Sequence, residues 1–277
     1  MAFKVKNFLG NENVKTLQDE GQFRIVEYQK DMSVFPQSAQ TSYFSSKMNI
    51  KKRQLICSLF KGNGIILQSG AMQWMAGDIQ ASTGIKGAGD LFGKVIKSKV
   101  TNETAVKPEY SGNGILVTEP TYKNLIIIDM DQWNNSVVLD DGIFLACDAQ
   151  IKQKINMRSN FSSAVAGGEG LFNLSLQGQG HAVLESECPM SELIELYLEN
   201  DCLKVDGNFA IAWSSSLDFT VERSTKSLLG SAASCEGLVN VYRGTGKVLM
   251  MPAGKDRWFE GNYCGSGGTT TIKTIVK

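Results

Sequence analysis

The sequence predicts an all-β protein made of three tandem modules of the β-sandwich or double-stranded β-helix type. Three observations predict this class. Apolar and polar residues alternate over short segments, Gly-x-Gly motifs recur along the chain, and glycine is abundant (28 residues) while proline is scarce (5 residues). Alternation is typical of strands, and glycine adopts the positive φ angles that tight hairpins and bulges require. A sandwich, a barrel and a β-helix all fit this pattern.

Two segments show the strand pattern most clearly. In residues 193–199, Ile194, Leu196 and Leu198 share one face of the chain, and two glutamates share the other. Residues 125–128 are an uninterrupted apolar run, which predicts a short strand that is buried on both faces.

Internal repeats support the modular reading. Residues 169–174 (EGLFNL) resemble residues 236–241 (EGLVNV), and an Asp-Gly pair opens both residues 141–144 and residues 206–209. The Gly-x-Gly motif occurs before apolar residues at 62–64, 112–114, 178–180 and 244–246. The last three motifs are equally spaced, whereas the first interval is shorter. We therefore predict a triplicated β unit with a degenerate first copy.

The repeats divide the chain into five parts. They are a polar leader with short strands (1–45), a degenerate first module (46–110), a second module (111–176), a third module (177–252) and a tail with a terminal strand (253–277). Residues 83–99, 159–168 and 228–234 are rich in glycine, serine, alanine or lysine, and we expect them to be connecting loops.

Catalytic chemistry has few candidate residues in this chain. His181 is the single histidine, so a Ser-His-Asp or Cys-His arrangement would have to use it. Its position directly after a Gly-x-Gly motif favours a structural role at a strand edge. One histidine and dispersed cysteines do not form a recognisable zinc ligand set. We predict a non-enzymatic protein with no catalytic, metal-binding or cofactor-binding residues.

Six cysteines occur without any Cys-x-x-Cys pair: Cys57, Cys147, Cys188, Cys202, Cys235 and Cys264. This spacing predicts free thiols in a reducing compartment. The first residues include no apolar segment of signal-peptide length, and no stretch is long and apolar enough to span a membrane. The cytoplasm is therefore the expected location.

Carboxylates occur close together at Asp129 and Asp131, at Asp140 and Asp141, and at Glu185 and Glu187. Alternate positions of a strand face the same way, as an acid pair or a calcium site requires. The stronger interpretation is that these residues are solvated and form turns at strand ends.

The segment 83–99 resembles a phosphate-binding loop only superficially, because Ala88 and Val95 replace residues that such a loop needs. Its lysines are Lys86, Lys94, Lys97 and Lys99. They predict either a loop that contacts anions or lipid, or a solvated connector.

Tryptophans are the best candidates for contact anchors, and they are Trp74, Trp133, Trp213 and Trp258. Core packing explains any one of them, and an interface role for at least one is a hypothesis. Charge is balanced, with 28 basic and 28 acidic residues, so no overall field attracts nucleic acid.

Four motifs in order carry a family resemblance: residues 69–78, 168–172, 178–180 and 205–207. With these motifs, residues 40–252 resemble the AIM-twenty-four (altered inheritance of mitochondria) family. The resemblance implies three modules with the fold of the tryptophan RNA-binding attenuation protein, and a closed homotrimer. Eukaryotic members are associated with mitochondrial inner-membrane organisation. The family offers no catalytic residues to transfer, and fold similarity does not transfer RNA binding.

The sequence thus predicts a non-enzymatic oligomeric scaffold or interaction protein that acts near a membrane surface or with a protein partner. The alternative is a small-ligand or nucleic-acid binding protein with sites between modules, near the glycine turns. The balanced charge makes nucleic acid the weaker ligand.

Overall fold

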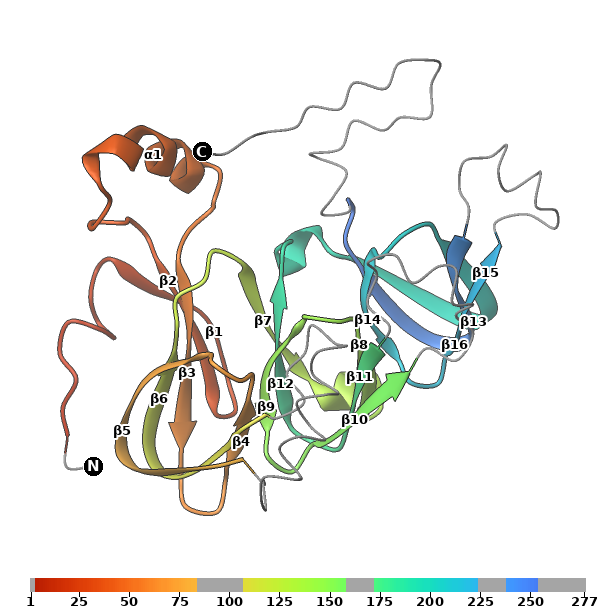
Figure 1. The fold of residues 1–277 in the computed structure, drawn as a ribbon, viewed down its shortest axis with the longest axis horizontal. Helices are drawn as coiled ribbons and strands as arrows, with labels where there is room; N and C mark the ends of the chain where they lie inside the picture. The colour runs from red at the N-terminus through yellow and green to blue at the C-terminus, as the bar shows by residue number, and fades with distance from the viewer. Residues whose placement is uncertain (1–2, 84–106, 158–171, 224–237, 254–277) are drawn as a thin grey trace, which may run out of the picture.

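The computed structural model describes residues 3–83, 107–157, 172–223 and 238–253. Most of these residues lie in strands, and the prediction of an all-β fold is confirmed. The described strands form two antiparallel sheets that lie side by side along the long axis of the molecule, and a short helix protrudes at one end (Figure 1).

The first sheet contains nine strands in the described part of the chain. They are β1 (Val14–Glu20), β2 (Phe23–Tyr28), β3 (Arg53–Leu59), β4 (Ile65–Leu67), β5 (Met72–Ser82), β6 (Glu109–Thr118), β7 (Asn124–Asp129), β9 (Phe144–Asp148) and β12 (His181–Ser186). Their order is β1-β2-β3-β6-β4-β9-β12-β7, and β5 pairs with β6.

The second sheet contains seven strands, counted over the same described residues. They are β8 (Ser136–Leu139), β10 (Lys152–Met157), β11 (Phe172–Gln177), β13 (Ile194–Val205), β14 (Ala210–Ser214), β15 (Asp218–Arg223) and β16 (Leu238–Met250). Their order is β10-β11-β8-β14-β16-β13, and β15 pairs with β16. The helices are η1 (Pro36–Ser38), α1 (Ala39–Lys47), η2 (Met130–Trp133) and η3 (Met190–Glu192).

Strand β7 is buried on both faces, as its apolar run predicts. Leu125 and Ile127 pack into a core made of residues of the first sheet, including Phe23 and Leu55. On the other face, Ile126 and Ile128 pack into a second core that contains side chains of both sheets. Because the first core is built by one sheet alone, that sheet must curl around it, and the second core joins the two sheets.

A side chain completes the curl of the first sheet. The amide of Gln18 on β1 donates to the carbonyl oxygen of Ile127 at 2.9 Å, and Ile127 N donates to Gln18 Oε1 at 3.0 Å. A register shift in β1 between Thr16 and Gln18 accompanies this contact. Gln18 thereby pairs with the edge of β7 as the backbone of a neighbouring strand would.

A third core lies in the second sheet, toward the end of the molecule formed by β13 to β16. It includes Trp213, Tyr242, Leu198 and Val248. The ring centroids of Trp213 and Tyr242 are 5.3 Å apart in an edge-to-face arrangement, which is a favourable geometry for aromatic pairs.

Two stretches of the chain pair in the same scheme. In the first, β12 pairs with β7 and β9, while β11 pairs with β10 and β8. In the second, the single long strand β16 pairs with β13, β14 and β15. The first glycine of each equally spaced motif has a similar backbone angle, with φ of +135° at Gly112 and Gly178 and +118° at Gly244. The recurrent sequence signal thus marks glycines with one type of backbone conformation.

Local predictions are confirmed at several elements. Residues 194–199 of the segment 193–199 form the start of β13, and residues 125–128 lie within β7. Helix α1 was not predicted, because its residues are polar or aromatic and show no apolar face. The five-part division of the chain stays a prediction. The strand expected in the tail and the loops expected at 159–168 and 228–234 lie outside the described residues.

Candidate functional site

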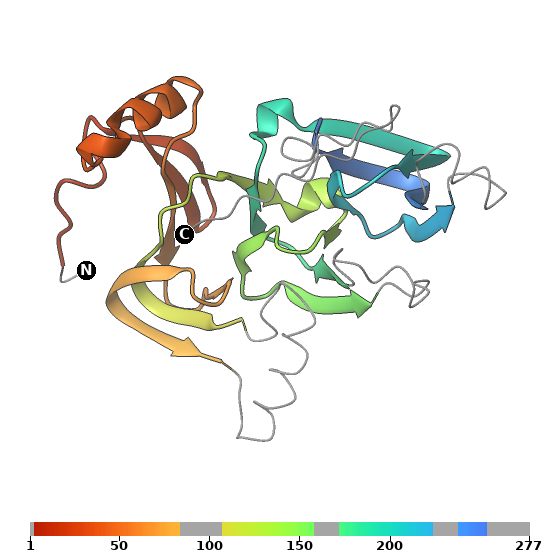
Figure 2. The ribbon, with the colours of Figure 1, turned by 45° about the horizontal axis from the view of Figure 1, so that its top comes forward.

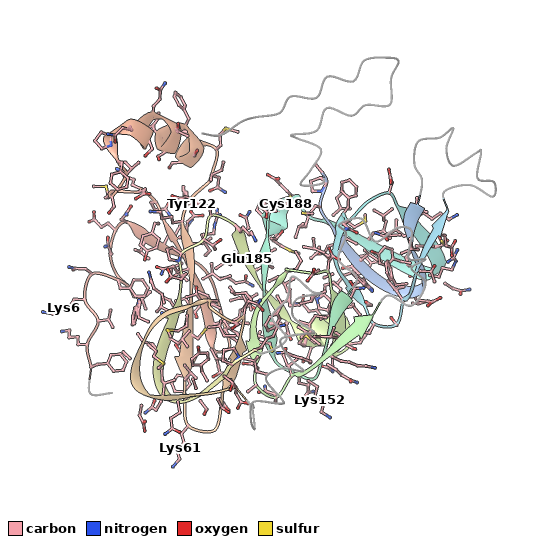
Figure 3. All side chains as sticks on the ribbon, in the orientation of Figure 1. Lys6, Lys61, Tyr122, Lys152, Glu185 and Cys188 are labelled. Atoms are coloured by element: carbon pink, nitrogen blue, oxygen red, sulfur yellow. The ribbon has the colours of Figure 1, made fainter. Side chains whose placement is uncertain are left out.

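An open cleft of about 500 Å³ lies between α1, the end of β2 and the segments that join α1 to β2 and β3. Its apolar lining comes from both sides, with Val34 and Tyr43 on the side of α1 and Ile50 and Tyr122 below. Figure 3 shows Tyr122 beneath the helix, at the end of the first sheet. None of the residues of α1 is buried, so the helix covers the cleft without filling it.

A buried ion pair supports the floor of this cleft. Arg53, which is 3% exposed, contacts the carboxylate of Glu27, with Nη2 and Glu27 Oε2 2.8 Å apart. The same guanidinium donates to the carbonyl oxygens of Asn49 at 3.1 Å and Tyr122 at 3.4 Å. Arg53 therefore ties together β2, the segment after α1 and the loop before β7.

Two lysines stand at the cleft beside this ion pair. Lys51 Nζ lies 3.3 Å from Glu27 Oε1, and Lys52 Nζ lies 2.7 Å from Asp31 Oδ2. The hydrogen bond from Lys52 lowers the pKa of Asp31, and the same bond raises the pKa of Lys52. The Lys52 ammonium also lies 5.9 Å from the centre of the Tyr122 ring. Each of the two lysines is therefore paired with a carboxylate at the wall of the cleft.

Sequence reasoning missed this cleft. Nearly all of its residues lie between positions 28 and 52, mostly in the predicted polar leader where no helix was expected, and Tyr122 comes from a distant loop. One signal could have indicated it: three consecutive basic residues, Lys51 to Arg53, lead directly into an apolar strand. A basic residue at the start of a buried strand needs a carboxylate partner, and Glu27 provides it.

The second notable feature is a pair of strand edges at opposite ends of the molecule (Figures 1 and 2). Over the described residues, β5 pairs only with β6 and β13 pairs only with β16, so each keeps one unpaired edge. Exposed apolar residues lie on both strands, with Met75 42% exposed and Tyr197 68% exposed. Such long edges are templates for pairing with another strand.

His181 lies at the first position of β12, beside the glycine turn, as predicted. Its backbone N–H donates to Asp148 Oδ2 at 2.7 Å, and its ring Nδ1 lies 3.7 Å from the same oxygen. The other oxygen of Asp148 accepts from the Gln22 side chain at 2.7 Å. The buried carboxylate thus joins the β1–β2 turn to the start of β12, which is a structural role.

The thiols nearest to Asp148 are poor nucleophiles. Cys57 and Cys147 are completely buried. Burial raises the pKa of Cys147 to about 12 and also raises the pKa of Cys57, and the Asp148 carboxylate adds to both shifts. A protonated thiol does not attack a substrate. Cys57, Cys147, Cys188 and Cys202 are free thiols, as predicted.

The carboxylate pairs lie at or near the ends of strands. Asp129 accepts a hydrogen bond from Asp131 N at 3.0 Å and caps η2, and Gly142, directly after Asp141, has a φ of +76°. Glu185 accepts from Thr121 Oγ1 at 2.7 Å and lies 3.8 Å from a lysine ammonium. Among the described residues, no group of three or more histidine, cysteine, aspartate or glutamate side chains could hold a metal ion.

The tryptophans lie in different environments. Trp133 and Trp213 are buried in cores, whereas Trp74 is partly exposed on the edge strand β5 and packs edge-to-face against Phe8. Of the three tryptophans that the structure describes, Trp74 is therefore the one next to an open edge. Trp258 and the lysines at 86, 94, 97 and 99 lie outside the described residues.

The chain itself fills the space next to some glycines of the motifs, whereas a Cβ atom added at Gly62 would meet nothing within 4 Å. A Cβ atom added at Gly112 would lie 2.0 Å from the carbonyl oxygen of Asp78, and one at Gly180 would lie 2.4 Å from Asp148 Oδ2. These glycines allow close backbone approach. The cleft beneath α1 lies elsewhere. None of the helices in the described ranges has both the length and the apolar character needed to cross a lipid bilayer.

Comparison with known proteins identifies the family. The profile of the family described as Mitochondrial biogenesis AIM24 matches residues 46–253, which is well over half of the chain. The chain belongs to this family. The resemblance inferred from the ordered motifs is thus confirmed. The match begins inside α1, so β1, β2 and most of α1, which covers the cleft, precede it.

Two relatives of the AIM24 chain come from Streptococcus pyogenes. An uncharacterized protein of serotype M6 is 26% identical over 196 residues, covering 68% of this chain and 77% of the relative. A crystal structure of a protein from the same species has a TM-score of 0.57 at 21% identity, and the match covers 85% of this chain and 96% of that one. At this identity the structural likeness shows the fold alone.

Proposed function

We propose that the protein is a non-enzymatic oligomeric scaffold whose subunits associate through the unpaired edges of β5 and β13. The observation that carries the proposal is the presence of two long edges at opposite ends of one chain. Two different surfaces that pair head to tail form a ring when the rotation closes. A closed homotrimer, as the family resemblance implies, is the expected assembly.

The internal repetition supports the same proposal. We infer that residues 124–186 and 194–250 are copies of one β unit, with boundaries that differ from the predicted modules 111–176 and 177–252, and that residues around β3 to β6 form a divergent third copy. The shared pairing scheme and the similar φ angles at Gly112, Gly178 and Gly244 favour this inference. Neighbouring units already pair strand to strand, since β4 pairs with β9 and β8 pairs with β14. Pairing between subunits would continue this pattern.

Two observations favour the scaffold role over catalysis. The single histidine, His181, contacts the Asp148 carboxylate, which joins the β1–β2 turn to the start of β12. The raised pKa values of Cys57 and Cys147 keep both nearby thiols protonated. A cytoplasmic location stays a prediction. Contact with a membrane surface through residues 83–99 also stays a prediction, because nearly all of that segment lies outside the described residues.

Light scattering coupled to gel filtration tests the proposal. We expect the dilute wild-type protein to be a trimer, and we expect Tyr197→Lys on β13 and Met75→Lys on β5 each to give monomers. A charged residue on an edge opposes strand pairing. Phe44→Lys on α1 is the control, because Phe44 is exposed to a similar degree (58%) and lies on neither edge.

Two results would contradict the proposal. A monomeric wild-type protein would exclude an obligate assembly. Dissociation by Tyr197→Lys but not by Met75→Lys would indicate a symmetric contact between two β13 strands, which closes as a dimer.

A further inference from the structure

The cleft beneath α1 has the size and lining of a ligand site. Its volume of about 500 Å³ falls within the range of about 300–1,000 Å³ typical of small-molecule pockets. Apolar atoms form most of the exposed lining surface, and Val34, Tyr43, Ile50 and Tyr122 are among the residues that contribute to it. The part of a ligand that fits this lining would therefore be a hydrocarbon chain.

Helix α1 lacks the contacts that normally hold a short helix in place. It has nine residues, buries none of them, and has no side-chain hydrogen bond at its N-cap. Isolated helices shorter than about 12–15 residues are marginal in water, and tertiary packing usually supplies their stability. Apolar side chains near it stay exposed, including Met32 at 80% and Tyr43 at 59%. A molecule in the cleft would provide the missing apolar contact.

The charges around the cleft favour an anion. Three lysines line it, Lys30, Lys51 and Lys52, against the carboxylate of Asp31, and a further carboxylate at its floor, that of Glu27, is shared between Lys51 and the buried Arg53. Lys52 binds Asp31 through one contact of 2.7 Å, and an ammonium group has three donors, so it can also bind an oxygen of a ligand. The side chains of Lys51 and Lys52 are 19% and 32% exposed, so an anion there would be partly shielded from water.

We propose that this cleft binds an amphiphilic anion, a molecule with a single alkyl or acyl chain and a carboxylate or phosphate head group. The chain lies between α1 and the floor formed by Ile50 and Tyr122, and the head group binds Lys52 and its neighbours. This binding function is independent of the assembly through β5 and β13, because the cleft lies at the end of the first sheet, away from both edges.

Calorimetric titration with decanoate and with decyl phosphate, both below their micelle concentrations, tests the proposal. We expect both to bind the full-length protein, and we expect uncharged decyl glucoside and inorganic phosphate to bind at least tenfold more weakly. Vesicles of phosphatidylglycerol and of phosphatidylcholine form a separate arm, which distinguishes a free amphiphile from a lipid surface.

Matched variants locate the site. Tyr43→Ser removes an aromatic wall of the cleft, and we expect it to weaken decyl phosphate binding about tenfold. Phe44→Ser is its control, because Phe44 is equally exposed but does not line the cleft. Lys52→Gln should weaken binding about tenfold through loss of a charge-assisted hydrogen bond. Lys61→Gln is its control, because Figure 3 shows Lys61 at the opposite end of the first sheet from Tyr122.

Several outcomes would overturn the proposal. Absence of binding by both alkyl anions would exclude the ligand class. Equal binding of decyl glucoside would exclude recognition of the charge, and equal effects of Tyr43→Ser and Phe44→Ser would indicate adsorption to the surface. Binding to phosphatidylglycerol vesicles alone, without binding of the monomeric anions, would replace the cleft with a membrane-docking surface.

Discussion

Strands β7 and β13 occupy equivalent places in the pairing scheme, yet their surroundings differ. Strand β7 pairs with β12, and the first half of β13 pairs with the C-terminal half of β16. All four apolar residues of β7 are buried, whereas Ile194 and Tyr197 of β13 are 46% and 68% exposed. The edge of β7 is paired by Gln18, while no strand in the described residues pairs with the outer edge of β13.

This difference shows that the position of a strand in the molecule decides how the backbone N–H and C=O groups of its edge find hydrogen-bond partners. β7 lies between two cores, so an unpaired backbone group there would be shielded from water and would cost stability. Gln18 removes that cost with a side chain. β13 lies at the end of the array, where water or another subunit can satisfy its backbone. We therefore expect changes at β7 to affect folding and changes at β13 to affect association.

The largest expected effect comes from Ile127→Ala in β7. Because Ile127 is 4% exposed and packs inside the curled first sheet, its truncation should lower the free energy of unfolding by about 2–5 kcal/mol. Tyr197→Ala in β13 should change it by less than about 0.5 kcal/mol. Urea denaturation monitored by tryptophan fluorescence measures both. Equal losses in the free energy of unfolding at the two positions would contradict the expectation that β13 contributes less to folding than β7.

A smaller effect is expected from Gln18→Ala, which uncovers the edge of β7. The N–H and C=O groups of Ile127 lose their partners, and we expect a loss of about 1–3 kcal/mol. Thr16→Ala on the same strand is the control, because Thr16 is exposed. Hydrogen exchange at the Ile127 amide should accelerate in the Gln18 variant alone. An unchanged exchange rate would argue that this side chain does not cap the edge.

The smallest effect should come from an exposed ion pair near the β13 end. Arg243 donates to both oxygens of Glu222, at 2.6 and 2.9 Å, and lowers the pKa of Glu222 from 4.5 to about 2. A lowered carboxylate pKa stabilises the folded state above pH 4.5, and the contribution is lost as the pH falls toward 2. The difference in Tm between wild type and Glu222→Gln should therefore shrink on acidification.

Thermal unfolding between pH 6 and pH 3, at the protein concentration used for light scattering, measures this difference. Glu199→Gln on β13 serves as the control, because Glu199 is also an exposed glutamate of the second sheet. A difference that stays constant or grows at low pH would mean that the contact with Arg243 does not hold the Glu222 carboxylate in its charged form.

The sequence predicted the structure well where the residues of one short segment were enough to fix its burial or its turn. Residues 125–128 could be predicted as a doubly buried strand because every side chain is apolar, and His181 could be placed beside a turn because glycines precede it. Helix α1 escaped because neither its composition nor its periodicity favours a packed helix. The cleft could not be predicted for a different reason. Lys52, Asp31 and Tyr122 come together only after β2, β3 and the β6–β7 loop are placed.

By itself, the sequence determined the all-β class, the family and the recurrent glycine bends, because alternation, motif order and glycine content are written in neighbouring residues. Only the tertiary structure decided which edges are covered, where the charges meet and where a cleft opens. Gln18 and Ile127 are distant in the chain, as are Glu27 and Arg53, and nothing in the neighbourhood of either residue indicates its partner. Contacts of this kind depend on how the sheet curls, which is a property of all its strands together.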